Sequence, residues 1–237
     1  PYACCEMGGG MTQFYKYRFV FPYNSVPAMS LIKVAEGCNF IGYYMFHGGS
    51  NPKGKKLEYT NDKAVPKISY DFDAMIGEFG QIRESYKRTK LQHYFFSTFE
   101  AEFCLTKTIL PENAEAIKPE DCHTLRYACR TIDGGGFLFI NNFQDHMQMS
   151  EKADVRILIE SEKGKIRIPY SGSLTVKKDS FYLLPCNICI GSAILKYATA
   201  QMITKIESDG VEYYFFFTPF GDTAEYCFEK KALGKLY

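Results

Sequence analysis

The chain has 237 residues, of which 46% are apolar, and its formal net charge is +1 at pH 7. This length provides an ample core for one large domain or two smaller ones. The balanced charge argues against binding to nucleic acid or to a membrane surface, and no apolar run approaches the roughly 20 residues of a membrane span. Tyrosine and phenylalanine are abundant but tryptophan is absent, so any aromatic platform for a ligand consists of tyrosine or phenylalanine.

The nine cysteines and four histidines do not form a metal-binding pattern. Cys186 and Cys189 make the single C-x-x-C, and no second pair completes a zinc site. Because they lie in an apolar, strand-like run, we interpret both as free core thiols. We therefore expect neither a metal nor another cofactor.

The first stretch, residues 2–11, is a short apolar run that delivers one carboxylate, Glu6, into three consecutive glycines, Gly8 to Gly10. Small, β-compatible residues before a glycine-rich turn predict a buried strand. Glycine allows the sharp turn and the close approach of a ligand. Glu6 is then expected at the carboxyl end of that strand, where α/β folds place their chemistry. The alternative is a glycine-rich turn with Glu6 simply solvated.

The next eighty residues alternate between helix and strand patterns. An aromatic and basic loop, residues 14–22, precedes a helix that begins near Ser25 and ends at Gly37. The near-continuous apolar run 38–46 predicts a strand buried on both faces, which completes a strand–helix–strand unit. A lysine-rich loop extends to about Lys67, and a long helix is predicted from Glu78 to about Phe103.

Beyond Pro111 the pattern changes to many short strands separated by turn signals about ten residues apart. Such spacing is typical of an antiparallel sandwich or barrel. Hairpin turns are predicted at residues 133–135 and 208–210. The run Val211–Phe217 is so apolar that we favour a central strand, although an edge strand that docks a partner chain is the alternative.

Three segments together resemble glycoside hydrolase family 35, the β-galactosidases. They are residues 5–11 (CEMGGGM), residues 43–51 (YYMFHGGSN) and residues 69–74 (SYDFDA), the last continuing into Glu78-Phe79-Gly80. The resemblance implies an α/β region followed by an all-β region. Residues 1–104 would be the C-terminal part of a (β/α)8 TIM barrel, its strands 7 and 8 with their helices. Residues 105–237 would be an antiparallel, β-sandwich-like second domain.

The resemblance also implies roles for five residues. Glu6 matches the catalytic nucleophile, and Tyr44 matches a tyrosine beside it, whose phenol would keep the carboxylate ionised and oriented. Phe72 stands where the family usually has a galactose-binding tyrosine, so only stacking or shape remains there. Met11 replaces a pocket-lining tryptophan of animal members. Tyr70 is grouped with these substrate-binding residues, although packing is its favoured role.

The implied activity is that of a retaining exo-β-galactosidase acting on terminal β-galactosides of oligosaccharides or glycoconjugates. This chemistry needs two carboxyl groups about 5–5.5 Å apart. The family's acid/base lies in an Asn-Glu pair that this sequence lacks. Glu58, Asp71 and Asp73 are the nearest substitutes by position, but we interpret Glu58 as a solvated charge and the two aspartates as loop-fixing groups.

The chain alone is therefore predicted to be inactive and to require an upstream barrel portion in cis. The resemblance favours a periplasmic or secreted location for the parent protein. The alternative function is a galactoside-binding relative that has lost catalysis, which Phe72, Met11 and the absence of tryptophan would fit.

Overall fold

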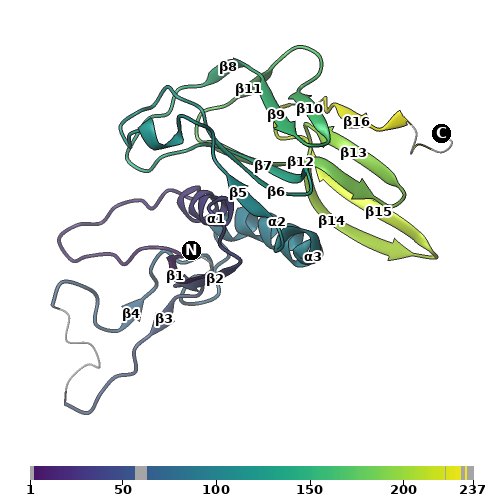
Figure 1. Ribbon diagram of the computed structural model, residues 1–237. Helices are drawn as coiled ribbons and strands as arrows, with labels where there is room; N and C mark the ends of the chain where they lie inside the picture. Colours follow the sequence, from purple (N-terminus) through teal and green to yellow (C-terminus); the bar gives the residue numbers. More distant parts are fainter. Residues whose placement is uncertain (1–2, 57–62, 222, 231–232, 234–237) are drawn as a thin grey trace.

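The computed structural model describes residues 3–56, 63–221, 223–230 and 233, and this part of the chain is mostly β (Figure 1). Its three α-helices are α1 (Ser25–Ala35), α2 (Glu84–Thr98) and α3 (Glu100–Phe103). The strands of the first half are β1 (Ala3–Gly8), β2 (Phe40–Tyr44), β3 (Gly49–Ser50), β4 (Ser69–Tyr70) and β5 (Lys107–Ile109). The second half contains β6 (Arg126–Ile132), β7 (Gly135–Asn142), β8 (Lys152–Val155), β9 (Ile157–Ser161), β10 (Gly164–Ile168), β11 (Leu174–Val176), β12 (Ser180–Ile190), β13 (Ala193–Ala198), β14 (Gln201–Ser208), β15 (Val211–Phe217) and β16 (Tyr226–Phe228).

The centre of the molecule is a six-stranded antiparallel sheet with the strand order β16-β13-β12-β7-β6-β5. The predicted turn between β6 and β7 is confirmed, because Asp133 and Gly134 both adopt positive φ, at 49° and 71°. The predicted turn between β14 and β15 is confirmed by the same pattern at Asp209 and Gly210. Two-residue turns with positive φ at both positions match the right-handed twist of the strands they join.

Both faces of this sheet are covered, because successive side chains point to opposite sides. Phe137 and Phe139 face a core that the helices complete. Leu138 and Ile140 face a second core, which is closed by residues of the small ladders β8–β11 and β9–β10. The near-continuous apolar run of β7 thus has partners on each side.

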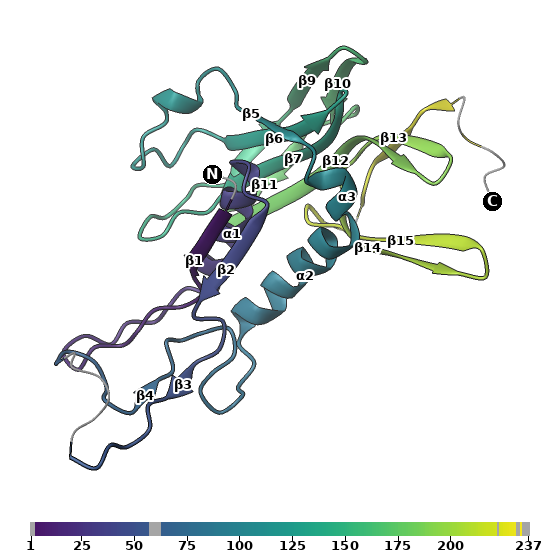
Figure 2. The same cartoon turned by 60° about the horizontal axis from the view of Figure 1, so that its bottom comes forward.

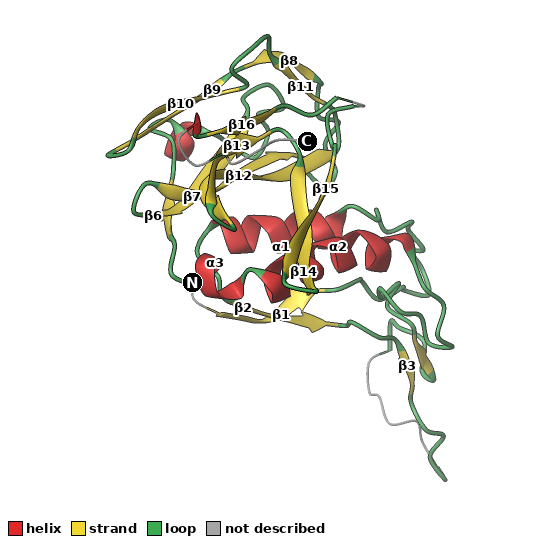
Figure 3. Ribbon diagram, turned by 90° about the vertical axis from the view of Figure 1, so that its right-hand side faces the viewer, coloured by secondary structure: helices red, strands yellow, loops and turns green. Residues whose placement is uncertain are grey.

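The helices form a middle layer between this sheet and the parallel pair β1–β2 (Figure 3). Leu31 and Val34 of α1 and Phe95 of α2 are buried against the sheet. On the other side, Val26 of α1 is buried with Met7 of β1. The predicted end of the first helix at Gly37 is confirmed, since Gly37 has a φ of 103°, which glycine adopts without strain.

Arg130 of β6 joins the sheet to α1 and α3, although a charged side chain is rarely fully buried. Arg130 is 1% exposed, and its guanidinium carbon lies over the ring of Phe103, 4.2 Å from the ring centroid. Burial lowers the pKa of Arg130, and no carboxylate is bonded to it in the part of the chain that the structure describes. Its donors instead reach oxygens near the ends of α1 and α3, namely Asn39 Oδ1 at 2.8 Å, Val34 O at 3.0 Å, Thr106 O at 3.2 Å, and Cys38 O and Phe103 O at 3.4 Å.

The fold class expected from the sequence is wrong. The chain is not an α/β barrel fragment followed by a β domain, because 40% of the described residues lie in strands, 15% lie in helices, and the sheets are mostly small and antiparallel. The expected strand–helix–strand unit exists locally as β1, α1 and β2. Its helix, however, covers the antiparallel sheet, and Met7 is the one fully buried residue of the two strands. The apolar residues of β1 and β2 are therefore not buried within a larger parallel sheet, as had been expected.

Three local expectations also need correction. The long helix begins at Glu84, six residues later than expected, and is interrupted at Phe99 (Figure 2). β15 pairs with β14 alone among the described strands, so it is not a central strand. Cys186 is buried as predicted, but Cys189 is exposed.

None of the described helices has the length and apolarity needed to cross a membrane. The expected domain boundary near residue 104 stays a prediction. Residues on both sides of that position share the core between the helices and the sheet.

Candidate functional site

Glu6 lies on β1 in a β-bulge, which fixes the side of the sheet that it faces. Two residues of β1, Cys5 and Glu6, stand opposite the single residue Gly42 of β2. Cys4 and Met7, on either side, contact the core, so the bulge directs both Cys5 and Glu6 to the exposed face. Only glycine fits at position 42, since a Cβ there would overlap the carbonyl of Cys5. Bulges of this kind are common next to active sites because they redirect a side chain.

Tyr44 shares the face of Glu6. Tyr43 pairs with Met7 and faces the core, so Tyr44, the next residue, faces the opposite way and is 50% exposed. Within the described contacts, no hydrogen bond joins the Tyr44 phenol to the Glu6 carboxylate. The structure thus brings these two predicted site residues to one face of one strand pair.

The glycines that follow β1 allow two other loops to pack closely against the chain at this point. A Cβ on Gly9 would overlap the carbonyl of Met45, and one on Gly10 would overlap the carbonyl of Phe72. The backbone N–H of Gly9 donates to Tyr44 O at 3.1 Å, and that of Met11 donates to Phe72 O at 2.6 Å. Three loops that are far apart in the sequence therefore meet beside Glu6 through backbone contacts that side chains would prevent.

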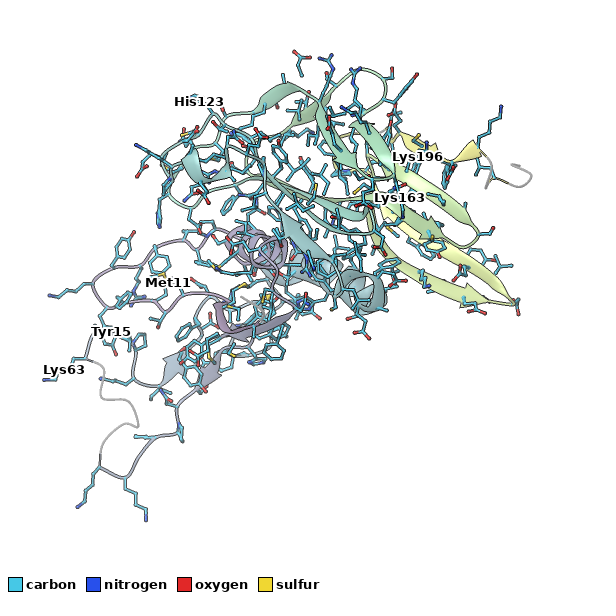
Figure 4. The ribbon with its side chains drawn as sticks, in the orientation of Figure 1. Met11, Tyr15, Lys63, His123, Lys163 and Lys196 are labelled. Atoms are coloured by element: carbon cyan, nitrogen blue, oxygen red, sulfur yellow. The ribbon has the colours of Figure 1, made fainter. Side chains whose placement is uncertain are left out.

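Phe72 occupies a strained position beside Tyr44. Its φ is 61° and that of Asp73 is 47°, a left-handed conformation that is costly for a bulky residue. The Phe72 ring meets the Tyr44 ring edge-on, with centroids 5.6 Å apart. Strain of this kind persists where the surroundings impose it, often at ligand sites. Met11, which is 46% exposed, is tied to this position by its backbone (Figure 4).

Tyr70 has a different environment. It belongs to the short ladder β3–β4, and its ring covers Gly49, where a Cβ would overlap the ring atoms. Gly48 is equally close to the backbone of Asp71. The contacts of Tyr70 are therefore those of a packing residue, the role that the sequence favoured over substrate binding.

The other carboxylates of these loops are already engaged. Asp71 forms an ion pair with Arg83 and accepts the backbone N–H of Glu78 at 2.6 Å. Asp73 accepts the amide of Gln13 at 2.6 Å and lies 3.9 Å from Arg83. Glu78 accepts hydrogen bonds from the hydroxyl groups of Ser50 and Ser69. The helix that was expected to begin at Glu78 begins six residues later.

Arg83 is the organising residue that the sequence analysis missed. It pairs with Asp71, and its Nη1 donates to the carbonyl of Ala74 at 2.7 Å. Its backbone N–H also donates to Met75 O at 3.1 Å. The signal was available, because the carboxylate-rich stretch 71–73 needs a nearby cation and Arg83 is the first one downstream.

A partly buried chain of hydrogen bonds joins β2 to α1 and α2. The Tyr43 hydroxyl lies 2.8 Å from His93 Nε2 of α2 and 3.1 Å from Ser30 Oγ of α1. Burial lowers the pKa of His93 and raises the pKa of Tyr43, so both are neutral at pH 7. These hydrogen bonds hold β2, the strand that carries Tyr44, against α1 and α2.

No cluster of three histidine, cysteine or carboxylate side chains suited to a metal ion occurs among the described residues. Glu58, one of the carboxylates considered as an acid, lies outside the described residues. No protein-family model matches this chain, and no curated protein matches it either. The resemblance to glycoside hydrolase family 35, and the roles it gives to individual residues, therefore stay predictions.

Proposed function

We propose that this chain supplies the nucleophile of a retaining β-galactosidase, and that Glu6 is that nucleophile. The observation that carries the proposal is the β-bulge that presents Glu6 on the exposed face shared with Tyr44, beside three interlocked loops. The carboxylate has no hydrogen-bonding partner among the described residues, so it is available to a substrate. Exposed carboxylates are common, and it is the redirected, glycine-dependent placement that supports a functional role.

In this reaction the Glu6 carboxylate attacks the anomeric carbon of a terminal β-galactoside. The glycosidic C–O bond breaks as a galactosyl ester forms, and an acid protonates the leaving oxygen. The conjugate base of that acid then deprotonates a water molecule, which displaces Glu6 and releases galactose. Each turnover consumes one water and restores both carboxyl groups.

The acid is not expected among the described carboxylates of the neighbouring loops. Asp71, Asp73 and Glu78 each hold a loop in place through the partners described above. We therefore propose that the acid lies in polypeptide beyond this chain, and that the chain by itself binds sugar but does not hydrolyse it. Tyr44 and Phe72 offer a sugar ring the apolar edge of an aromatic pair.

The test uses the polypeptide that carries this chain, treated with a 2-deoxy-2-fluorogalactosyl inactivator that traps the glycosyl ester. Peptide mass spectrometry is expected to find the label on Glu6. The Glu6→Gln variant should lose labelling and at least about a thousandfold in activity, by comparison with other nucleophile removals. Glu100→Gln, an exposed carboxylate on α3, is the matched control and should label normally.

A label on another residue, or normal turnover by Glu6→Gln, would overturn the assignment. A second candidate is galactoside binding without hydrolysis, which is favoured by the hydrogen bonds and ion pairs that already occupy Asp71, Asp73 and Glu78 and by the missing hydroxyl at Phe72. Saturable galactoside binding with neither labelling nor turnover would select that candidate.

A further inference from the structure

A cavity of about 330 Å³ lies between α1 and one end of the large sheet, and none of its walls belongs to the strands or loops around Glu6. The short length of β5 leaves room for it. This strand pairs with Cys129 to Thr131 of β6 and ends at Ile109, shortly before Pro111, which lacks the N–H needed to extend the ladder. The first residues of β6, Arg126 to Ala128, therefore have no paired strand on that side among the described residues, and they line the cavity.

The walls of the cavity are mainly apolar. One side belongs to α1 and the other to the face of the sheet that α1 covers, and the apolar residues of the two sides are Leu31, Ile32, Ala35, Ala128 and Phe139. Leu110, which follows β5 and is 54% exposed, lines the cavity as well. The volume is at the lower end of the range for small-ligand sites, about 300–1,000 Å³. Such walls suit the hydrocarbon part of a small ligand.

Arg126 adds a cation to this apolar cavity. Its Nη1 donates to Gln144 Oε1 at 2.5 Å, and Gln144 lines the cavity too, so this edge of the guanidinium lies at the cavity wall. Its Nη2 donates to the carbonyl oxygens of Asp121 at 3.0 Å, Pro119 at 3.2 Å and Lys118 at 3.3 Å. All four acceptors are uncharged oxygens, so these bonds orient the guanidinium without neutralising it.

The charge of Arg126 has no counter-ion in the part of the chain that the structure describes. No described carboxylate forms an ion pair with it, and one hydrogen of Nη1 has no acceptor there. Burial and the nearby charge of Arg126 lower the pKa of Lys152, and Asp121 opposes this shift, so two cations lie near one carboxylate. Glu36 lines the cavity as well, but it is exposed and lies 3.6 Å from Lys33. The guanidinium therefore favours a ligand that carries a negative charge.

We propose that this cavity binds a small carboxylic acid with a hydrocarbon body, such as a medium-chain fatty acid. The carboxylate accepts a hydrogen bond from Arg126 Nη1, and the hydrocarbon lies against Leu31 and Phe139, between α1 and the sheet. Hydrogen bonds between a guanidinium and a carboxylate are short and strong, and the burial of the apolar body adds to the affinity. This inference does not depend on the role of Glu6.

The experiment compares octanoate with octanol, its uncharged counterpart, by isothermal titration calorimetry on the polypeptide that carries this chain. Octanoate should bind saturably and more tightly than octanol, whereas a purely apolar cavity would prefer octanol because a carboxylate is costly to remove from water. Arg126→Gln should weaken octanoate binding about tenfold or more and change octanol binding less than about twofold. Arg167→Gln, at an exposed position on β10 outside the cavity wall, is the matched control. Ala128→Leu, which fills the cavity and keeps Arg126, should weaken the binding of both probes.

The preference of the unchanged protein for octanoate keeps the test decisive if Arg126→Gln fails to fold. A preference for octanol, or no saturable octanoate binding, overturns the proposal. Octanoate binding that both Arg126→Gln and Ala128→Leu leave unchanged places the ligand elsewhere and overturns it too. A dimer that Ala128→Leu dissociates on a sizing column would show that a second copy of the chain fills the cavity instead. None of these results bears on the labelling of Glu6.

Discussion

Replacing Arg130 with methionine tests whether one buried guanidinium holds the sheet and the helices together. Methionine fills a similar volume and packs against Phe103, but it donates no hydrogen bonds. The change leaves the backbone oxygens at the ends of α1 and α3 without their donor. The guanidinium stays charged at pH 7 despite the lowered pKa, because its usual value is far above neutrality.

The magnitude follows from the three best hydrogen bonds of Arg130, at 2.8, 3.0 and 3.2 Å. Hydrogen bonds from a charged donor contribute about 1.5–3 kcal/mol each, so their gross contribution is about 5–9 kcal/mol. Removing the guanidinium also removes the cost of burying it, which is several kcal/mol. We therefore expect the free energy of unfolding to fall by about 3–5 kcal/mol, a large part of the stability of an ordinary domain.

Urea unfolding followed by circular dichroism measures this change, since the chain has no tryptophan to report by fluorescence. With a denaturant dependence of about 3 kcal/mol per molar, the midpoint should fall by about 1–2 M. Arg167→Met, at an exposed position on β10, is the control and should change stability by less than about 0.5 kcal/mol. A loss of under about 1 kcal/mol in Arg130→Met would refute the reasoning.

Three further predictions concern the site and its supports. Gly10→Ala should lower the melting temperature by several degrees because its Cβ would overlap Phe72 O, whereas Gly8→Ala, whose Cβ meets nothing closer than 3.9 Å, should be tolerated; equal effects would contradict the loop contact. The contribution of neutral His93 to stability should be complete above its ordinary pKa of 6.5 and lost as pH falls through the lowered folded-state value. His93→Gln should flatten that part of the pH–stability curve, and an unchanged slope would exclude His93 as its source. Tyr197→Phe should cost about 1–3 kcal/mol in urea unfolding because the buried hydroxyl accepts the Tyr170 N–H at 2.7 Å and donates to Glu225, while Tyr127→Phe, where no such bond forms in the described structure, should cost little.

Local structure was largely predictable, because it depends on neighbouring residues. Gly134 and Gly210 mark turns that require positive φ, and Gly37 ends a helix for the same reason. How the elements assemble was not predictable in the same way. The apolar run of β15 resembles a central strand, yet its alternate residues are exposed in a two-stranded ladder. Periodicity shows which face is apolar but not which element will cover it.

The candidate site, too, was predictable from the sequence only in part. The glycines after β1 were expected to let a ligand approach closely, and the structure shows that the backbone of two other loops approaches Gly9 and Gly10 instead. The resemblance grouped Glu6, Tyr44 and Phe72, and the structure places all three around two neighbouring strand ends. Gln13 was missed because only the folded loops bring it to Asp73, whereas Arg83 could have been anticipated as the first cation after residues 71–73. The burial of Arg130 could not be predicted from the sequence, because charged residues are usually exposed.

The helices that are shared between the two β layers have a consequence for limited proteolysis. A protease that cuts in the loop between β5 and β6, residues 110–125, severs the backbone but leaves Phe95, Phe103 and Phe137 in contact. The two pieces should therefore co-migrate on a sizing column after cleavage and separate only in denaturant. Because β1, β2 and the helices that cover them all belong to the N-terminal piece, the cut itself should leave the Glu6 face intact.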